Sequence, residues 1–501
     1  MGVVKHQSLK STVLIYFGFL VGGINTLLLF PHFFSDDEFA LTRLFLDIGV
    51  ILVPFCTLST GPSVNRFFPY YASHLKEKDN DLISWAFLFS LLGFFLFVLA
   101  TFVFHNWILR EYAANSPLFI SYFYLLYPYV FFFSLFGLFE SYSGSRHQTV
   151  LPNFLKEVVV RVATTALVIA CYLHWISFTA FMWLFSLLSG FTLVILLVYL
   201  RRRKMLHFTF RMSNVTRRLF PRMAVYSLSL LGATIFSLLA QNIGSLIISS
   251  RQGLKHVAYL SIAYYIATLI QVPQRSIAGI ATPVLAQSWK ERDMEKIGEI
   301  YQKSSLLQLI AALFIFLAIW LNIDNIFSFL PPSYSVGKYA VFLLGLSKVI
   351  DMGTGLNSQL LSTSRWWRFD LYSSGILLAL SVPLNVVLIE KYGLDGTGYA
   401  ALLSMFVFNT VRCLFIWKKF GLLPFTAATG KAILIAISAW LAAVWLPAAP
   451  SALADICLRG ALFAVVFIGG ILLFRVSGDI NSTAGAMLQK ILSYLFRSHK
   501  Q

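Results

Sequence analysis

Apolar and polar stretches alternate along this chain, and the apolar runs are about twenty residues long from Ser11 to the tail. A helix of about twenty apolar residues spans the roughly 30 Å hydrocarbon core of a bilayer. The pattern therefore predicts an all-α, polytopic membrane protein of about fourteen transmembrane helices. The predicted spans are residues 11–30, 41–61, 83–103, 118–141, 154–174, 177–200, 222–249, 258–284, 304–322, 336–361, 369–389, 396–417, 430–448 and 456–475.

Composition excludes a water-soluble fold, because 58% of the residues are hydrophobic and only 12% are charged. Soluble domains carry roughly a quarter of charged residues. A secretory signal peptide is an alternative for the first run, which follows Lys5 and Lys10. That run is long enough to span, and it ends in Pro31 and His32 instead of the small residues of a cleavage site. We therefore expect a membrane helix there.

The positive charges predict the orientation of the spans. Of the 39 Lys and Arg residues, 30 lie in the N-terminus and alternate connections, and seven lie on the opposite side. Because cytoplasmic loops carry the excess of Lys and Arg, both termini are predicted to be cytoplasmic. The basic run 201–204 directly abuts a span, which favours contact with anionic lipid headgroups over binding of nucleic acid.

The sequence contains no pattern of residues that is typical of an enzyme active site. Four cysteines are scattered without CxxC spacing, and the nine histidines form no metal-ligand spacing. The longest connection, residues 201–221, contains no Asp or Glu that would serve as acid or base. We therefore expect no enzyme activity, no metal and no cofactor.

An internal repeat relates residues 69–83 to residues 283–297 without a gap. Each copy follows an even-numbered span, the second and the eighth, so the predicted repeat unit is six helices. The two copies then face the same side, and a parallel repeat creates a cavity between two lobes that rock to alternate access. A chance likeness of short charged connections is the alternative. The predicted divisions are lobes 1–203 and 204–421, followed by two extra helices and a basic cytoplasmic tail over 422–501.

Three places in the sequence resemble a known family. They are residues 34–40 with 61–69, residues 273–283, and residues 383–385 with the Tyr-Gly-Leu-Asp-Gly turn that starts at Tyr392. These segments are similar to the polysaccharide flippases of the multidrug/oligosaccharidyl-lipid/polysaccharide (MOP) superfamily, which includes O-antigen and lipid II flippases. Two departures stand out, because Ala40 replaces a usual glycine and the first span lacks the arginines of lipid II flippases.

The resemblance implies a function in cell-surface polysaccharide synthesis, such as that of O-antigen in lipopolysaccharide. It implies a bacterial inner-membrane protein that flips a polyprenyl-pyrophosphate-linked oligosaccharide to the outer leaflet. The implied partners are this lipid-linked substrate, membrane lipids and candidate glycan-assembly proteins, and a proton or sodium gradient is a candidate driving force. It also implies that Arg275 in the eighth span lies in the cavity, like the arginine of lipid II flippases.

Ionisable residues inside spans are expensive and therefore candidates for function. Arg275 could grip the pyrophosphate through two parallel hydrogen bonds, or its side chain could reach the headgroups instead. Lys348 and Asp351 lie three residues apart on one helical face. Either they neutralise each other, or Lys348 contacts the substrate while Asp351 takes up the coupling ion. Arg43 and Asp47 lie four residues apart, also on one helical face. Either they neutralise each other or they act in gating.

Neutral polar residues in the spans are further candidates for contact with sugar hydroxyls. They are Asn25 in the first span and Gln241 and Asn242 in the seventh. Hydrogen bonding between helices is the alternative role for such side chains. Three charged residues near predicted cytoplasmic helix ends rank behind them: Glu140, Glu157 and Arg161.

Two other functions remain open at this point. A cation-exporting multidrug antiporter of the same superfamily should carry acidic residues in its first lobe, and the first span contains none. A scaffold for envelope assembly that transports nothing is the other alternative, which the charges inside the spans disfavour.

Overall fold

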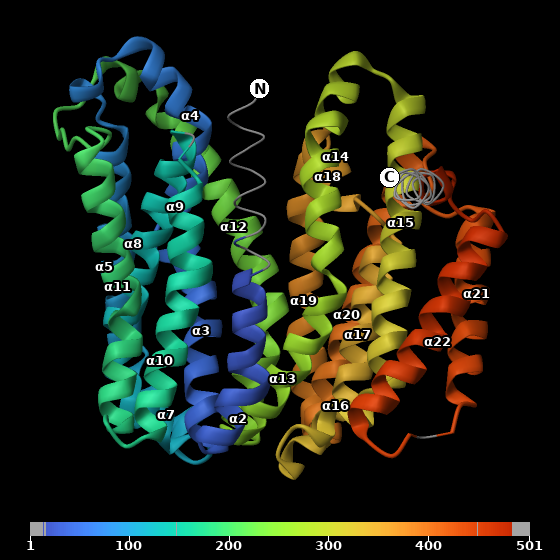
Figure 1. Cartoon of the computed structure of the whole chain (residues 1–501). Helices are drawn as coiled ribbons and strands as arrows, with labels where there is room; N and C mark the ends of the chain where they lie inside the picture. Colours follow the sequence, from blue (N-terminus) through green and yellow to red (C-terminus); the bar gives the residue numbers. More distant parts are fainter. Residues whose placement is uncertain (1–13, 15–16, 147, 448, 483–501) are drawn as a thin grey trace, which may run out of the picture. The chain divides into compact units, whose positions relative to one another are not determined.

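The computed structural model describes residues 14, 17–146, 148–447 and 449–482, and all regular elements within these ranges are helices (Figure 1). The predicted all-α class is therefore confirmed. Part of the predicted first span and most of the predicted basic tail, residues 483–501, lie outside the described residues.

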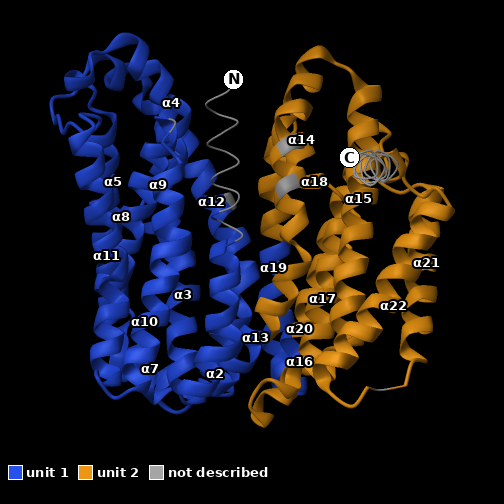
Figure 2. Ribbon diagram, viewed as in Figure 1, with its two compact units in different colours: residues 1–262, 377–397 blue, residues 263–376, 398–501 orange. Residues whose placement is uncertain are grey.

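The chain divides into two compact units, which Figure 2 colours separately. Unit 1 comprises residues 1–262 and 377–397. In chain order its helices are η1 (Ile24–Leu29), α2 (Phe30–Phe33), α3 (Asp36–Cys56), α4 (Thr60–His74), η2 (Glu77–Asp79), α5 (Leu82–Val103), α6 (His105–Ala113), α7 (Pro117–Tyr122), η3 (Phe123–Leu125), α8 (Leu126–Ser145), α9 (Val150–Asn153), η4 (Phe154–Val159), α10 (Val160–Tyr172), α11 (Phe178–Arg202) and α12 (Asn214–Arg251). A core of large apolar side chains from α4, α5, α8 and α11 holds it together.

Unit 2 comprises residues 263–376 and 398–501. Its helices are α14 (Val272–Glu291), α15 (Met294–Leu321), α16 (Ile323–Ser328), η5 (Pro332–Gly337), α17 (Lys338–Gly353), α18 (Asn357–Thr363), α21 (Ala427–Val444) and α22 (Ala452–Leu473). Three helices have residues in both units: α13 (Lys255–Ile270), α19 (Trp367–Tyr392) and α20 (Leu394–Phe420). The α21–α22 hairpin packs on α15, where Phe314 contacts Phe463 and Phe467.

The number of membrane spans is lower than predicted when length and apolar character are applied strictly. Within the described residues, ten helices pass this test, or eleven if the bent pair Pro332–Gly353 and Asn357–Thr363 is one span. Helix is found in every one of the fourteen predicted ranges, but fourteen spans are not confirmed. For two of the ranges the cause is physical, because a break divides α13 from α14 and Lys156, Glu157 and Arg161 interrupt the fifth range, whereas the first range lies partly outside the described residues.

The two copies of the sequence repeat contain matching helix breaks. Between α3 and α4, Leu58 and Ser59 adopt positive φ angles of 48° and 51°. The Val53 carbonyl accepts from both the hydroxyl and the backbone N–H of Thr57, at 2.8 and 2.9 Å. Thr57 lies before the aligned residues, but the same offset places it opposite Gln271, the residue that separates α13 from α14. The repeat therefore extends from sequence to local backbone geometry.

The predicted lobe boundaries at residues 203 and 421 stay a prediction. The two units group helices that touch one another, so α12 falls with unit 1 although the repeat assigns it to the second lobe.

Candidate functional site

A buried polar cluster in unit 2 surrounds the carboxylate of Asp351, near the end of α17. Gln271 and Gln274 donate amide hydrogen bonds to its Oδ2 atom at 3.1 and 3.3 Å. Asn409 of α20 donates to Oδ1 at 3.2 Å. Three side-chain amides, two from the start of α14 and one from α20, therefore hold one carboxylate. The sequence pattern did not predict this arrangement.

A second layer of hydrogen bonds fixes these amides. The Thr354 hydroxyl donates to Oδ1 of Asn409 at 2.9 Å. Asn357 in turn accepts a hydrogen bond from the hydroxyl of Tyr301, which is fully buried. Such a connected network holds its members in one geometry, because each lost bond would leave a polar group unpaired in an apolar interior.

Two helix breaks create this cluster. Gln271 lies between α13 and α14, and α14 begins with Pro273 in its first turn, where a missing N–H costs nothing. On the other side, α17 ends before Gly355, which has a φ of +74°. A Cβ at Gly355 would lie 2.9 Å from the Cβ of Ser305, so both conformation and space require glycine there.

The two predicted cationic residues of unit 2 lie near the cluster in sequence but do not pair with it. Lys348 is half-buried one turn before Asp351, and no salt bridge joins the two side chains within the described residues. Arg275 follows Gln274 directly, in the first turn of α14, and its side chain is exposed. Among the described residues, no carboxylate lies within 4.0 Å of its guanidinium. The direct hydrogen-bond partners of Asp351 are thus amide groups, and its neutralisation of Lys348 stays a prediction.

An ion pair that the sequence analysis missed lies in the same unit. Arg412 of α20 is 6% exposed and donates a hydrogen bond to Asp370 of α19. Its Nε donates to Ser373 at 3.0 Å, and its guanidinium lies 3.9 Å from the centre of the Phe408 ring. The sequence signal was present, since both residues fall inside the predicted spans 369–389 and 396–417.

In unit 1, Asn25 joins the first helix to α10. Its amide donates to the Arg161 carbonyl at 3.0 Å, and its Oδ1 accepts from Thr165 at 2.6 Å. Arg161 also donates to Glu157 at 2.7 Å and to the carbonyl of Gly18. Asn25, Glu157 and Arg161 therefore form one contact between the first helix and α10. This contact lies at the two short π-helical segments η1 and η4.

The other predicted residues of unit 1 have different partners from those of Asn25. Asp47 of α3 lies beside Arg43, one turn away, and beside the hydroxyl of Ser245 on α12. Gln241 and Asn242 use their amide groups within their own helix, where they donate to the carbonyls of Ser237 and Leu238, respectively, at 3.1 and 2.8 Å. The binding of substrate by these residues stays a prediction.

The family of the chain follows from its sequence profile. The family described as polysaccharide biosynthesis protein matches residues 9–289, and the family described as MatE matches residues 230–387. The first match covers more than half of the chain, so the protein belongs to the polysaccharide biosynthesis protein family. A comparison with curated protein sequences gives no match.

Solved structures with a similar fold agree with this assignment. The lipid II flippase MurJ in an inward closed conformation has a TM-score of 0.74 at 14% identity, over 93% of this chain and 98% of that chain. An inward-facing multidrug resistance MATE family transporter of the MOP superfamily has a TM-score of 0.60 at 16% identity, over 83% and 94% of the two chains. The Vibrio cholerae MATE transporter VcmN in the bent form gives 0.53 at 14% identity, over 84% and 98%.

The protein therefore has the fold of the MOP superfamily, as its motifs predicted. Within that superfamily, the family match places it with the polysaccharide biosynthesis proteins.

Proposed function

We propose that this protein flips a polyprenyl-pyrophosphate-linked oligosaccharide from the cytoplasmic to the outer leaflet of a bacterial inner membrane, for cell-surface polysaccharide synthesis. Membership in the polysaccharide biosynthesis family and a fold shared with a flippase and multidrug transporters support transport over catalysis. The proposed mechanism is alternating access, with both termini in the cytoplasm.

The single observation that carries this proposal is Arg275. An arginine in a membrane helix costs about 3 kcal/mol on insertion scales, and more in simulations. Arg275 is exposed, and no described carboxylate neutralises it. Its position in the first turn of α14 adds the positive end of a helix dipole, which also favours anions. A guanidinium donates two parallel hydrogen bonds to the oxygens of a pyrophosphate. Binding of an anionic ligand therefore explains an arginine whose insertion into a membrane is unfavourable.

Lys348 and Asp351 complete the proposed mechanism. The Lys348 ammonium supplies a second cation for the substrate. Asp351 is the proposed site of the coupling ion, either a proton or sodium. The three amide groups that surround it are neutral, so the carboxylate keeps a negative charge that can attract a small cation.

The test uses a strain whose surface polysaccharide depends on this protein. We expect Arg275→Ala to abolish polysaccharide export and Arg275→Lys to retain part of it, because lysine keeps the charge but loses the planar fork. Lys290→Ala is the matched control, since Lys290 is an exposed cation in the last turn of the same helix. Protein levels in the membrane are measured for each variant. Normal export by Arg275→Ala at normal protein level would contradict the assignment of this residue.

A multidrug antiporter is the second candidate, and the MatE match over residues 230–387 favours it. That range includes Asp351, a membrane carboxylate that could exchange a cation for a cationic drug. Reconstituted protein that moves ethidium against a proton or sodium gradient, but leaves a lipid-linked oligosaccharide in place, would establish the antiporter. The opposite result would establish the flippase, and movement of neither compound would leave the scaffold role.

A further inference from the structure

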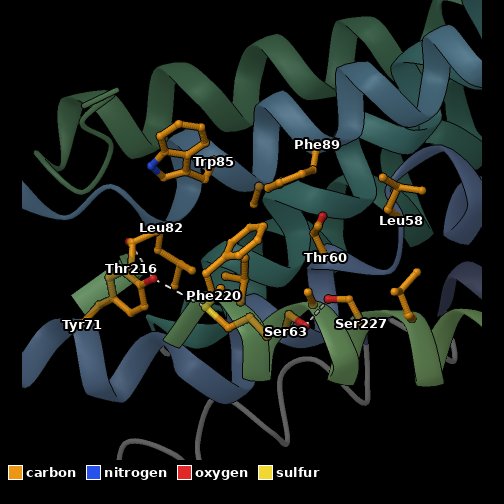
Figure 3. Close-up of a pocket in the computed structure, with 15 residues that line it drawn as sticks. Leu58, Thr60, Ser63, Tyr71, Leu82, Trp85, Phe89, Thr216, Phe220 and Ser227 are labelled. Atoms are coloured by element: carbon orange, nitrogen blue, oxygen red, sulfur yellow. Dashed lines mark hydrogen bonds between the residues drawn. The ribbon is translucent and has the colours of Figure 1, made fainter. Parts of the chain in front are cut away.

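Unit 1 contains an apolar cavity of about 190 Å³ among α4, α5 and α12 (Figure 3). Figure 3 shows Trp85 and Phe89 of α5 on one side of it and Phe220 of α12 on another. The residues that line it are Leu58, Thr60, Ser63, Val64, Tyr71, Leu82, Trp85, Ala86, Phe89, Thr216, Phe220, Met223, Ala224, Ser227 and Leu228.

The hydroxyl groups in the cavity wall bond to one another. Tyr71 and Thr216 share a hydrogen bond of 2.8 Å, and Ser63 is bonded to Ser227. Thr216 also donates to the buried carboxylate of Asp81 at 2.8 Å. These groups are already paired, so the wall offers little to a sugar and suits a hydrocarbon ligand.

One edge of α12 combines residues that line the cavity with exposed ones. Leu228 is 64% exposed, and Ala224 lies one turn earlier on the same helical stripe. Continuing this stripe toward the start of the helix leads to Pro221 and then to Arg217, which is exposed. The other edge of α12 is covered, because the guanidinium of Arg66 stacks 4.3 Å from the centre of the Tyr226 ring.

We propose that this cavity binds a short segment of the isoprenoid chain of the lipid-linked substrate while Arg217 contacts its phosphate. The inference rests on the proposed function and names a second contact for the same substrate. Two observations point to this occupant: an apolar wall, and an exposed cation, Arg217, on the helical stripe that continues from Leu228 and Ala224. Arg217 lies one turn after the start of α12 at Asn214, so the helix dipole adds positive potential there. A lipid phosphate with a hydrocarbon chain matches both parts.

The experiment uses the full chain in nanodiscs of phosphatidylcholine and phosphatidylglycerol. A polyprenyl phosphate with a diazirine on its isoprenoid chain is the probe, and adducts are mapped by mass spectrometry. We expect adducts on the cavity-lining residues of α4, α5 and α12. Excess unlabelled polyprenyl phosphate should compete, whereas added phosphatidylglycerol should not.

Matched variants separate this site from general contact with lipid. Arg217→Ala should reduce labelling about fivefold, the effect of one cation near an anionic lipid surface. Ala224→Phe should reduce it to background by filling the cavity. Arg218→Ala and Val225→Phe, which change neighbouring exposed residues on other faces of α12, should leave it unchanged.

Three results would overturn the proposal: adducts on lipid-facing residues only, equal effects of the matched variants, or equal competition by phosphatidylglycerol. Transport of lipid-linked oligosaccharide is measured on the same preparations. Cavity labelling without transport by the wild-type protein would refute the proposed function, whereas transport without cavity labelling would refute the cavity assignment alone.

Discussion

Removal of the Asp370 carboxylate would leave the guanidinium of Arg412 inside unit 2 without its counter-ion. Arg412 is 6% exposed, whereas Asp370 is 27% exposed. Breaking a buried ion pair from one side costs roughly 3–5 kcal/mol. Because water reaches Asp370, we expect Asp370→Ala to destabilise the protein by about 3 kcal/mol, the low end of that range. This corresponds to a change of about a hundredfold in an equilibrium constant.

Two further variants of the Asp370–Arg412 pair should change the stability of the protein by smaller amounts. Asp370→Asn keeps an oxygen that accepts from Arg412, so a smaller loss of about 1 kcal/mol is expected. The double variant Asp370→Leu with Arg412→Met removes both charges and should recover most of the stability, because no charge is then left unpaired.

Thermal unfolding in detergent, followed by tryptophan fluorescence, measures these differences. For a chain of 501 residues, about 3 kcal/mol corresponds to a fall of about 3 °C in the apparent Tm. The control is the exposed pair of Lys303 and Glu299, with side chains 53% and 57% exposed. Glu299→Ala should cost at most about 0.5 kcal/mol. If Asp370→Ala lowered the Tm no more than Glu299→Ala, the reasoning from burial would be wrong.

Three other predictions follow from packing, topology and chemistry. Gly93→Ala should lower the Tm by about 2–4 °C, since its Cβ would lie 2.2 Å from a backbone oxygen of α3, whereas Gly460→Ala has open space and should be neutral or stabilising. In whole cells, an impermeant thiol reagent should label a cysteine introduced next to Asp37 but not one next to Lys204; the opposite result would reverse the predicted orientation. Asp351→Asn should insert normally yet lose the dependence of transport on the ion gradient, and a variant that kept this dependence would exclude Asp351 as the coupling site.

The fold class of this protein was predictable because its signal is local. A run of about twenty apolar residues must satisfy its backbone hydrogen bonds internally in a bilayer, and a helix does this without any partner. The structure therefore places helix in all fourteen predicted ranges. The repeat was visible in the sequence as the alignment of residues 69–83 with 283–297, whereas the breaks at Thr57 and Gln271 were found only in the structure.

The pairing of polar side chains was decided by tertiary structure alone. Hydropathy locates Asp351 in a span, but only helix rotation and two backbone breaks bring the amides of Gln271, Gln274 and Asn409 to its carboxylate. Arg412 illustrates the same limit, because a count of charges near helix ends cannot tell whether a guanidinium faces water or another helix. Partners of this kind are separated by tens of residues, and their contact depends on how helices pack, which no local pattern encodes.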